Sequence, residues 1–280
     1  MSGEANSRIL AVILCGGQGT RIRGVADDLP KPMVPIGNKP ILWHIMRLYS
    51  AHDINDFVLC LGYKGSVIKE YFLNYRALSS DLTVNLGDHR SVEFHDPAVE
   101  NWRVTLADTG DKAQTGARLS RVRKYLHDAE LFCLTYGDGV ADLDICELID
   151  FHRAHGRIAT VTGVRPPGRF GVMRTDRSAD VPVVSDFQEK SQTEHGWING
   201  GFFVLNRELW DYISDDEDLV FEREPLQRLA QDGQLVMFEH HGFWQPMDTY
   251  REWSLLNHLW HNGNAPWDQK TCSKTLIATK

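Results

Sequence analysis

Short apolar runs and helical patterns alternate along the first half of the chain. The runs lack regular polar positions, which is typical of strands covered on both faces. They are ILAVIL (9–14), DFVLCLG (56–62) and LFCLTYGD (131–138). Apolar side chains at helical spacing follow each run, at 40–50, 65–76 and about 143–155. Strands that alternate with helices predict βαβ units and a largely parallel sheet.

The second half of the chain is richer in strand patterns. Residues 82–107 carry short alternating stretches that predict edge strands or an antiparallel insertion, and 158–205 is also mostly strand-like. Helical patterns return at 222–232 and 249–262. We therefore expect an α/β protein with three layers, a mixed, mainly parallel sheet and a smaller β region.

The length and composition indicate a globular protein with a sizeable core. The chain has 280 residues, of which 42% are hydrophobic and 24% are charged. We expect a single domain over residues 8–268, with residues 1–7 and 269–280 as flexible tails.

Charge and apolar segments narrow the choice of partners and compartment. A formal net charge of −8 argues against nucleic acid or a membrane surface as the partner. The longest early apolar run, Ile9 to Cys15, is shorter than the roughly 18–20 residues that span a bilayer. The polar start is not a secretory signal. None of the five cysteines forms a C-x-x-C pair. These features predict a reduced, cytoplasmic protein.

A glycine-rich segment at the end of the first predicted strand carries the clearest chemical signal. It reads LCGGQGTRIRGVADDLPKPM over residues 14–33. Glycines at a strand end let the backbone approach a ligand and turn N–H groups toward an anion. Arg21, Arg23 and Lys31 add positive charge, so the segment suits a polyphosphate. A tight turn followed by solvated cations would explain the glycines equally well.

Two common phosphate-binding loops do not fit this segment. The dinucleotide fingerprint requires a third glycine where Ile22 stands, and no acidic residue ends the second predicted strand. The G-K-[ST] sequence of the P-loop is absent. These differences argue against a nicotinamide-dependent oxidoreductase.

A series of motifs over residues 8–268 resembles the sugar-nucleotidyltransferases, also called nucleoside-diphosphate-sugar pyrophosphorylases. The motifs are GGQGTR, PKPM, PILWHIM, DFVLCLGYKG, YFLNY, DTG, TGAR, FCLTYGDGV, PPGRFGVM, FQEK, GWINGGFFVL and DGQLVMFEHHGFWQPMDT. The resemblance implies a Rossmann-like nucleotidyltransferase fold whose smaller β region binds the sugar, and a homo-oligomer. It is strongest to the branch that transfers the cytidylyl group of CTP to glucose 1-phosphate, which gives CDP-glucose.

The implied reaction requires cations more than it requires a base. A sugar 1-phosphate oxygen attacks the α-phosphorus of a nucleoside triphosphate and pyrophosphate leaves, so two anionic reactants must be held in line. The resemblance places Mg²⁺ on Asp138, which follows the third buried run, and on Asp248 in GFWQPMD. Without the resemblance, each aspartate is better explained as a turn or cap residue.

The resemblance also assigns the other site residues. Lys31 is expected to hold the triphosphate and Arg21 to contact the leaving phosphates, so that Arg21, Lys31 and Asp138 are catalytic. The nucleotide-binding positions are Leu14, Cys15, Gly16, Gly17, Gly19, Thr20, Arg21, Lys31, Thr115, Gly116, Arg118, Gly137 and Asp138. The sugar phosphate-binding positions are Glu189, Lys190, Asn199 and Gly200. As an alternative, Glu189 and Lys190 would form a surface ion pair of little energy.

Two functional alternatives stay open. The chain could use another base or sugar phosphate, because IRGVADDL and Ser191 depart from the family pattern beside the nucleotide loop and the sugar pocket. It could also be a non-catalytic homologue that binds nucleotide sugars. The presence of Arg21, Lys31, Asp138, Lys190 and Asp248 favours the enzyme.

Two histidine pairs are expected on helix surfaces. His152–His155 and His258–His261 have the H-x-x-H spacing of some zinc sites. Zinc would need further ligands, and no cysteine is placed to supply one.

Overall fold

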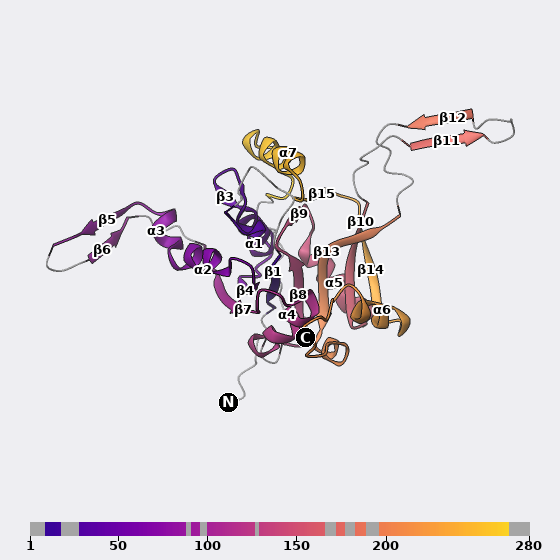
Figure 1. Cartoon of the computed structure of the whole chain (residues 1–280), viewed down its shortest axis with the longest axis horizontal. Helices are drawn as coiled ribbons and strands as arrows, with labels where there is room; N and C mark the ends of the chain where they lie inside the picture. Colours follow the sequence, from indigo (N-terminus) through magenta and orange to yellow (C-terminus); the bar gives the residue numbers. More distant parts are fainter. Residues whose placement is uncertain are drawn as a thin grey trace.

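The computed structural model describes residues 9–17, 28–87, 91–95, 100–126, 129–165, 172–176, 183–188 and 196–268, with the backbone only for 172–176 and 183–188. A seven-stranded sheet runs through the molecule (Figure 1). Its strands are β1 (Ala11–Cys15), β4 (Asp56–Leu61), β7 (Arg103–Asp108), β8 (Leu131–Tyr136), β10 (Ala159–Val164), β13 (Ile198–Asn206) and β14 (Leu235–His240).

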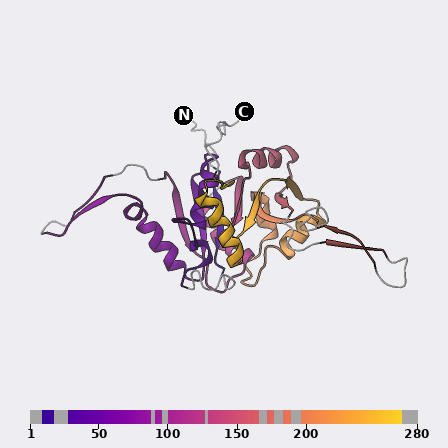
Figure 2. The same ribbon diagram turned by 90° about the horizontal axis from the view of Figure 1, so that it is seen from above.

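The other strands form two-stranded ribbons. They are β2 (Pro35–Ile36) with β3 (Lys39–Pro40), β5 (Leu82–Asn85) with β6 (Ser91–Phe94), β9 (Gly139–Ala141) with β15 (Trp244–Pro246), and β11 (Val172–Asp176) with β12 (Val183–Gln188). Ribbons β5–β6 and β11–β12 project from opposite sides of the molecule (Figures 1 and 2). The sequence-based prediction of an antiparallel insertion within 82–107 is therefore confirmed for 82–94.

Helices follow most strands of the central sheet. They are α1 (Ile41–Ser50), α2 (Gly65–Leu73), α3 (Tyr75–Ser79), α4 (Thr115–Val122), α5 (Ile145–His155), α6 (Glu224–Gln231) and α7 (Tyr250–His261), with short 3₁₀ helices η1 (Lys31–Met33), η2 (Arg123–Tyr125) and η3 (Arg207–Tyr212). None of the described helices combines the length and the apolar character that crossing a bilayer requires.

The strand order explains where a ligand can bind. It is β14-β10-β13-β8-β1-β4-β7, and neighbours are parallel except at β13, which is antiparallel to both β10 and β8. The prediction of a mixed, mainly parallel sheet is therefore confirmed. From β1 the chain builds the sheet outward through β4 to β7 and then returns to β8 on the other side of β1. Open α/β sheets bind ligands where the strand order reverses in this way, at the carboxyl ends of the strands.

Strand β1 shows why the sheet has helices on both faces. Ile13 and Cys15 belong to a core cluster with side chains of α1 and α5, whereas Val12 and Leu14 belong to a second cluster with Leu119 of α4. Successive side chains of a strand point to opposite faces, so a strand that is apolar at every position needs cover on both. The apolar run predicted this, and the three-layer arrangement is confirmed.

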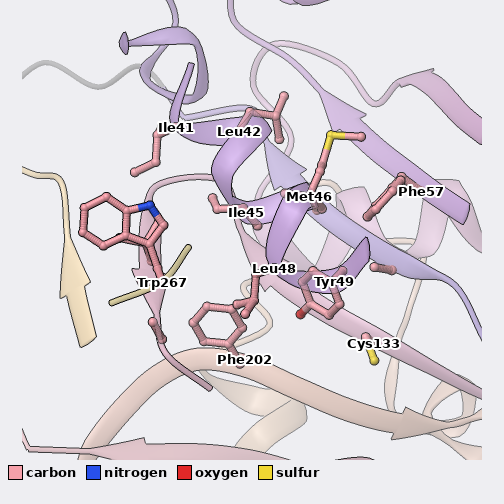
Figure 3. Close-up of a cluster of buried hydrophobic side chains, with 14 of the residues drawn as sticks. Ile41, Leu42, Ile45, Met46, Leu48, Tyr49, Phe57, Cys133, Phe202 and Trp267 are labelled. Carbon is pink, nitrogen blue, oxygen red and sulfur yellow. The ribbon is translucent and has the colours of Figure 1, made fainter. Parts of the chain in front are cut away.

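The larger core cluster is centred on α1. Helix α1 turns Leu42, Ile45 and Tyr49 toward the sheet, where each side chain is at most 1% exposed (Figure 3). Trp267, which follows α7, packs in the same cluster and is also 1% exposed. Full burial of such side chains stabilises the fold by about 1.5–3 kcal/mol each. The core therefore joins an early helix to the last described segment of the chain.

Two local predictions need correction, and two strands were missed. The helix predicted over 65–76 is two helices, because Asn74 directs both its backbone N–H and its side-chain amide to the carbonyl of Glu70 and α2 ends there. Strands β14 and β15 were not predicted from the pattern. His152 is not on a helix surface: it is 1% exposed, and its ring nitrogens lie 2.8 Å from Thr160 Oγ1 and 2.9 Å from Asn206 Oδ1.

Candidate functional site

A cavity of about 140 Å³ lies at the carboxyl ends of β1 and β8. Its lining residues come from four separate segments of the chain. They are Leu14, Gly16, Gly17, Lys31, Pro32, Thr115, Arg118, Tyr136, Gly137 and Asp138. Asp138 was predicted at the carboxyl end of its strand, and the structure places it two residues after the end of β8. We call this space the strand-end cavity.

Glycine at position 137 lets two strand ends approach closely beside the cavity. The Gly137 N–H donates to the carbonyl of Leu14 at 3.0 Å, which ties the end of β8 to the glycine segment. A Cβ added at Gly137 would lie 3.1 Å from that carbonyl oxygen and 3.0 Å from the Pro32 ring. A side chain would therefore require the Leu14 carbonyl or the Pro32 ring to give way by a few tenths of an ångström.

Lys31 joins the two aspartates that the sequence assigned to a metal. Its Nζ lies 2.5 Å from Asp138 Oδ2 and also contacts Asp248 Oδ1. The ammonium side chain is 12% exposed, and the two carboxylates are about one-third exposed. Asp138 and Asp248, which lie 107 and 217 positions after Lys31 in the chain, thus meet at its ammonium group.

The position of Asp248 follows from local hydrogen bonding. Ribbon β9–β15 pairs Pro246 with Gly139, and the Met247 N–H donates to the carbonyl of Asp138 at 2.8 Å. The Asp248 N–H then donates to Glu252 Oε2 at 2.7 Å, at the start of α7. A capping box between Thr249 and Glu252 fixes this helix start. The backbone at Asp248 is therefore fixed by the hydrogen bond of Met247 on one side and by the start of α7 on the other.

The charges around Lys31 favour its protonated form. Burial opposes the positive charge, but the carboxylates of Asp138 and Asp248 outweigh it, and the pKa of Lys31 is raised. The group carries two negative charges and one positive charge when both carboxylates are ionised. A further cation is the natural complement of such a group.

The donor set is consistent with a divalent metal. Both carboxylates reach the same Nζ atom, so their oxygens face a common space, and oxygen ligands suit Mg²⁺. No cluster of three or more His, Cys, Asp or Glu side chains that could hold a metal occurs within the described ranges. The protein would therefore supply two ligands, which fits an ion that also takes phosphate oxygens and waters.

Arg118 lies beneath the glycine segment. It is 5% exposed. Its guanidinium donates to the carbonyls of Leu61, Gly110, Gly16 and Asp111 and to Thr109 Oγ1. These acceptors are neutral, and burial lowers the pKa of Arg118. A Cβ added at Gly16 would lie 2.1 Å from its guanidinium carbon, so the glycine makes room for the cation. Arg118 therefore adds positive charge to the cavity wall and connects three strand ends.

A hydrogen-bond network crosses the opposite wall. Glu222 accepts the hydroxyl of Thr115 at 2.6 Å and that of Tyr136 at 2.5 Å, one on each carboxylate oxygen. The Phe221 N–H donates to Thr115 Oγ1 at 2.9 Å. The Asn199 amide lies 3.4 Å from the Tyr136 hydroxyl. The network connects a predicted nucleotide residue, Thr115, to a predicted sugar residue, Asn199.

Sequence reasoning missed Tyr136 and Glu222. Tyr136 precedes the Gly137–Asp138 pair, so its place in the motif was a usable signal. Glu222 lies just before α6, which begins at Glu224, and 107 positions separate it from Thr115, so no local pattern could reveal it.

Some predicted residues lie behind the cavity wall. Cys15 is fully buried, and burial raises its pKa well above the ordinary value. The Gly116 N–H donates to the carbonyl of Leu219 at 2.9 Å. Gly200 accepts the indole N–H of Trp244 at 2.7 Å. Gly19, Thr20, Arg21, Glu189 and Lys190 lie outside the described residues, as do the predicted tails 1–7 and 269–280.

Comparison with known proteins gives this geometry its context. The profile of the nucleotidyl transferase family matches residues 10–249. The chain belongs to the nucleotidyl transferase family. The match spans every segment that lines the strand-end cavity, and the family resemblance of the motifs is confirmed.

Individual members of the nucleotidyl transferase family support the same conclusion. The glucose-1-phosphate cytidylyltransferases of Salmonella typhi and Salmonella typhimurium are each 55% identical to this chain over 257 residues, which cover 92% of this chain and 98% of theirs. The crystal structure of HddC from Yersinia pseudotuberculosis is similar with a TM-score of 0.65 at 23% identity, covering 90% of this chain and 99% of HddC. The Rossmann-like nucleotidyltransferase fold is thereby confirmed.

Proposed function

We propose that this nucleotidyl transferase converts CTP and glucose 1-phosphate into CDP-glucose and pyrophosphate, with Mg²⁺ as the metal. One observation carries the proposal: two glucose-1-phosphate cytidylyltransferases are 55% identical to the chain over nearly their whole length. The strand-end cavity supports it, because Lys31, Asp138 and Asp248 meet there beside the glycine segment.

The proposed chemistry is a displacement at phosphorus. An oxygen of glucose 1-phosphate forms a bond to the α-phosphorus of CTP while the bond to the bridging oxygen of the β-phosphate breaks, and pyrophosphate leaves with that electron pair. The attacking phosphate is anionic at neutral pH, so no protein base is required. The task of the protein is to hold both reactants in line and to neutralise their charge.

The residues of the cavity divide this task. Lys31 would move its ammonium from the aspartates to the triphosphate, where a point charge suits a phosphate oxygen. Asp138 and Asp248 would hold the divalent metal that enzymes of this family generally use. When bound, Mg²⁺ neutralises phosphate charge and orients the phosphates. The N–H groups after β1 and the buried Arg118 would complete the phosphate-binding wall. Arg21 would stabilise the departing pyrophosphate.

The sugar phosphate would bind toward the start of β13. Asn199 is the described residue of the proposed sugar pocket that reaches the cavity wall, through Tyr136. The Asn199 side-chain oxygen accepts the N–H of Gly201 at 2.8 Å, which fixes the amide. Glu189 would bind sugar hydroxyls and Lys190 the sugar phosphate, and both follow β12 directly in the sequence.

The assembly and compartment belong to the same proposal. Large apolar side chains gather on α2, α3 and the projecting ribbon β5–β6. They are Leu73, Leu78, Val84, Leu86 and Val92, and Leu86 is 81% exposed. A two-stranded ribbon with exposed apolar residues gains stability from cover by another surface, which supports a homo-oligomer. We place this oligomer in the cytoplasm, where CTP and sugar phosphates are produced.

An activity panel tests the proposed function. The purified chain is supplied with Mg²⁺ and with CTP, UTP, GTP, ATP or dTTP, each against several hexose 1-phosphates, and pyrophosphate release is measured. We expect the highest kcat/KM for CTP with glucose 1-phosphate. A higher kcat/KM for a purine nucleotide would overturn the base assignment, and no pyrophosphate release from any pair would favour the non-catalytic homologue.

A further inference from the structure

The carboxylate of Glu222 determines how two hydroxyl groups of the cavity wall are oriented. Thr115 and Tyr136 line the strand-end cavity, and each directs its hydroxyl proton to a different oxygen of Glu222. A hydroxyl has one proton to donate and two lone pairs to accept with. Both protons are used, so neither hydroxyl can donate to a ligand.

The remaining capacity of both hydroxyls is to accept. Thr115 Oγ1 already accepts the Phe221 N–H at 2.9 Å, and the Tyr136 oxygen accepts the Asn199 side-chain amide at 3.4 Å. One lone pair on each oxygen is left. A ligand atom that meets this wall must therefore bring its own hydrogen, as an amino group does and a carbonyl oxygen does not.

Glu222 is held so that this orientation persists. The segment before it pairs with the start of α4: the Gln114 N–H donates to the carbonyl of Glu217 at 3.1 Å, and the Gly116 and Ala117 N–H groups donate to the carbonyl of Leu219. The Phe221 side chain is fully buried in the core cluster that covers the same face of the sheet. The backbone that leads into Glu222 is thus fixed to the element that carries Thr115.

We propose that Glu222 is a positioning residue that makes this wall select the 4-amino group of cytosine over the 4-carbonyl of uracil. The inference rests on the proposed function, because it takes CTP as the nucleotide. Glu222 acts through Thr115 and Tyr136 and is not among the described residues that line the cavity. A hydrogen bond to an amino group forms with these acceptors, whereas a carbonyl oxygen would face lone pairs and lose its partner.

The substitution Glu222→Gln tests this role. A glutamine amide has one oxygen and one NH₂ group, so it accepts from only one hydroxyl and donates to the other. The second hydroxyl then regains a free proton and can donate to uracil. We expect the ratio of kcat/KM for CTP to kcat/KM for UTP, both with glucose 1-phosphate and Mg²⁺, to fall about tenfold or more. Titration calorimetry with CTP and with UTP should show the same change in the ratio of Kd values.

Two further variants make the test decisive. Glu217→Gln removes a charge from the same segment at an exposed residue that pairs with Arg121, and it should leave the CTP to UTP ratio unchanged. Tyr136→Phe removes one of the two oriented acceptors without touching the carboxylate, and it should also lower the CTP to UTP ratio. This variant therefore tests the inference even if Glu222→Gln does not fold.

The possible outcomes separate this inference from the proposed function. A wild-type protein that prefers CTP, with Glu222→Gln and Tyr136→Phe within twofold of its ratio, would overturn the role of Glu222 alone. A wild-type protein with no preference for CTP over UTP, or with no turnover of CTP, would overturn both.

Discussion

Acidification should unfold this protein partly through one buried histidine. His44 on α1 is 1% exposed, its Nε2 lies 3.0 Å from the carbonyl of Ile36, and the indole N–H of Trp267 donates to its Nδ1 at 3.3 Å. This arrangement requires the neutral ring with its proton on Nε2, because a proton on Nδ1 would face the N–H of Trp267.

The size of the effect follows from the pKa. The pKa of His44 is lowered to about 4, mainly by burial and to a smaller extent by the charge of Lys39, while the hydrogen bond to Ile36 and the charge of Asp268 act in the opposite direction. In the unfolded chain the ordinary value is about 6.5. Above that pH both states are neutral and the stability is fully present. As the pH falls from about 6.5 to 4, only the unfolded chain takes up the proton, so stability is lost.

The loss can be measured as a difference between two proteins. At pH 4.5, proton uptake by His44 in the unfolded chain lowers the free energy of unfolding by about 2.5 kcal/mol. Urea unfolding followed by tryptophan fluorescence at pH 7.0 and at pH 4.5 gives this free energy for the wild type and for His44→Gln, whose side chain does not titrate. We expect the wild type to lose about 2.5 kcal/mol more than the variant between the two conditions.

A matched control isolates the buried position. His258→Gln changes an exposed histidine on α7 and should lose as much stability on acidification as the wild type. Equal losses, within about 0.5 kcal/mol, for the wild type and His44→Gln would refute the assignment of acid sensitivity to His44.

Three further predictions concern the site. Asp138→Asn and Asp248→Asn should each lower kcat by at least about a hundredfold in the pyrophosphate assay with Mg²⁺ while circular dichroism stays unchanged, because each removes a metal carboxylate; turnover near wild type in the double variant would contradict the metal assignment. Lys31→Ala should lower kcat more than it raises KM for CTP, because charge shifts at the α-phosphorus during transfer; an effect on KM alone would show a role in ground-state binding only. Gly201→Ala should lower the free energy of unfolding in urea by more than about 2 kcal/mol, because φ is 80° and the added Cβ would lie 2.5 Å from the ring of Tyr136. Gly156→Ala, with φ of 61° and no atom within 4 Å, should lower it by about 1 kcal/mol. Equal losses for the two variants would mean that the ring moves freely.

The sequence predicted the sheet and its helices where one periodicity dominates. Strands β1, β4 and β8 are apolar except at Asp56 and Thr135, and α1 places its apolar side chains on one face, so each has a single consistent interpretation. Strand β14 was missed because LVMFEH mixes apolar and polar residues at an edge of the sheet, where one side needs no partner.

The site was predicted only as far as motifs reach. Asp138 and Lys31 were assigned to the site because the motifs that contain them, FCLTYGDGV and PKPM, resemble those of the family. Their contact with one another, and the network through Glu222, depend on tertiary packing between segments that local patterns do not connect. The same holds for His152, whose burial follows from Thr160 and Asn206 and not from its own helix.

The pairing of β9 with β15 has a consequence for how the protein is made. Because 217 positions separate Lys31 from Asp248, a chain emerging from the ribosome exposes Lys31 and Asp138 well before their second carboxylate partner exists. The carbonyl of Asp138 receives the Met247 N–H, and Trp267 enters the core beside α1, only after those later residues have been synthesised. A nascent polypeptide that has not yet reached Asp248 therefore lacks one of the two carboxylates proposed to hold the metal, and we expect it to turn over no nucleotide.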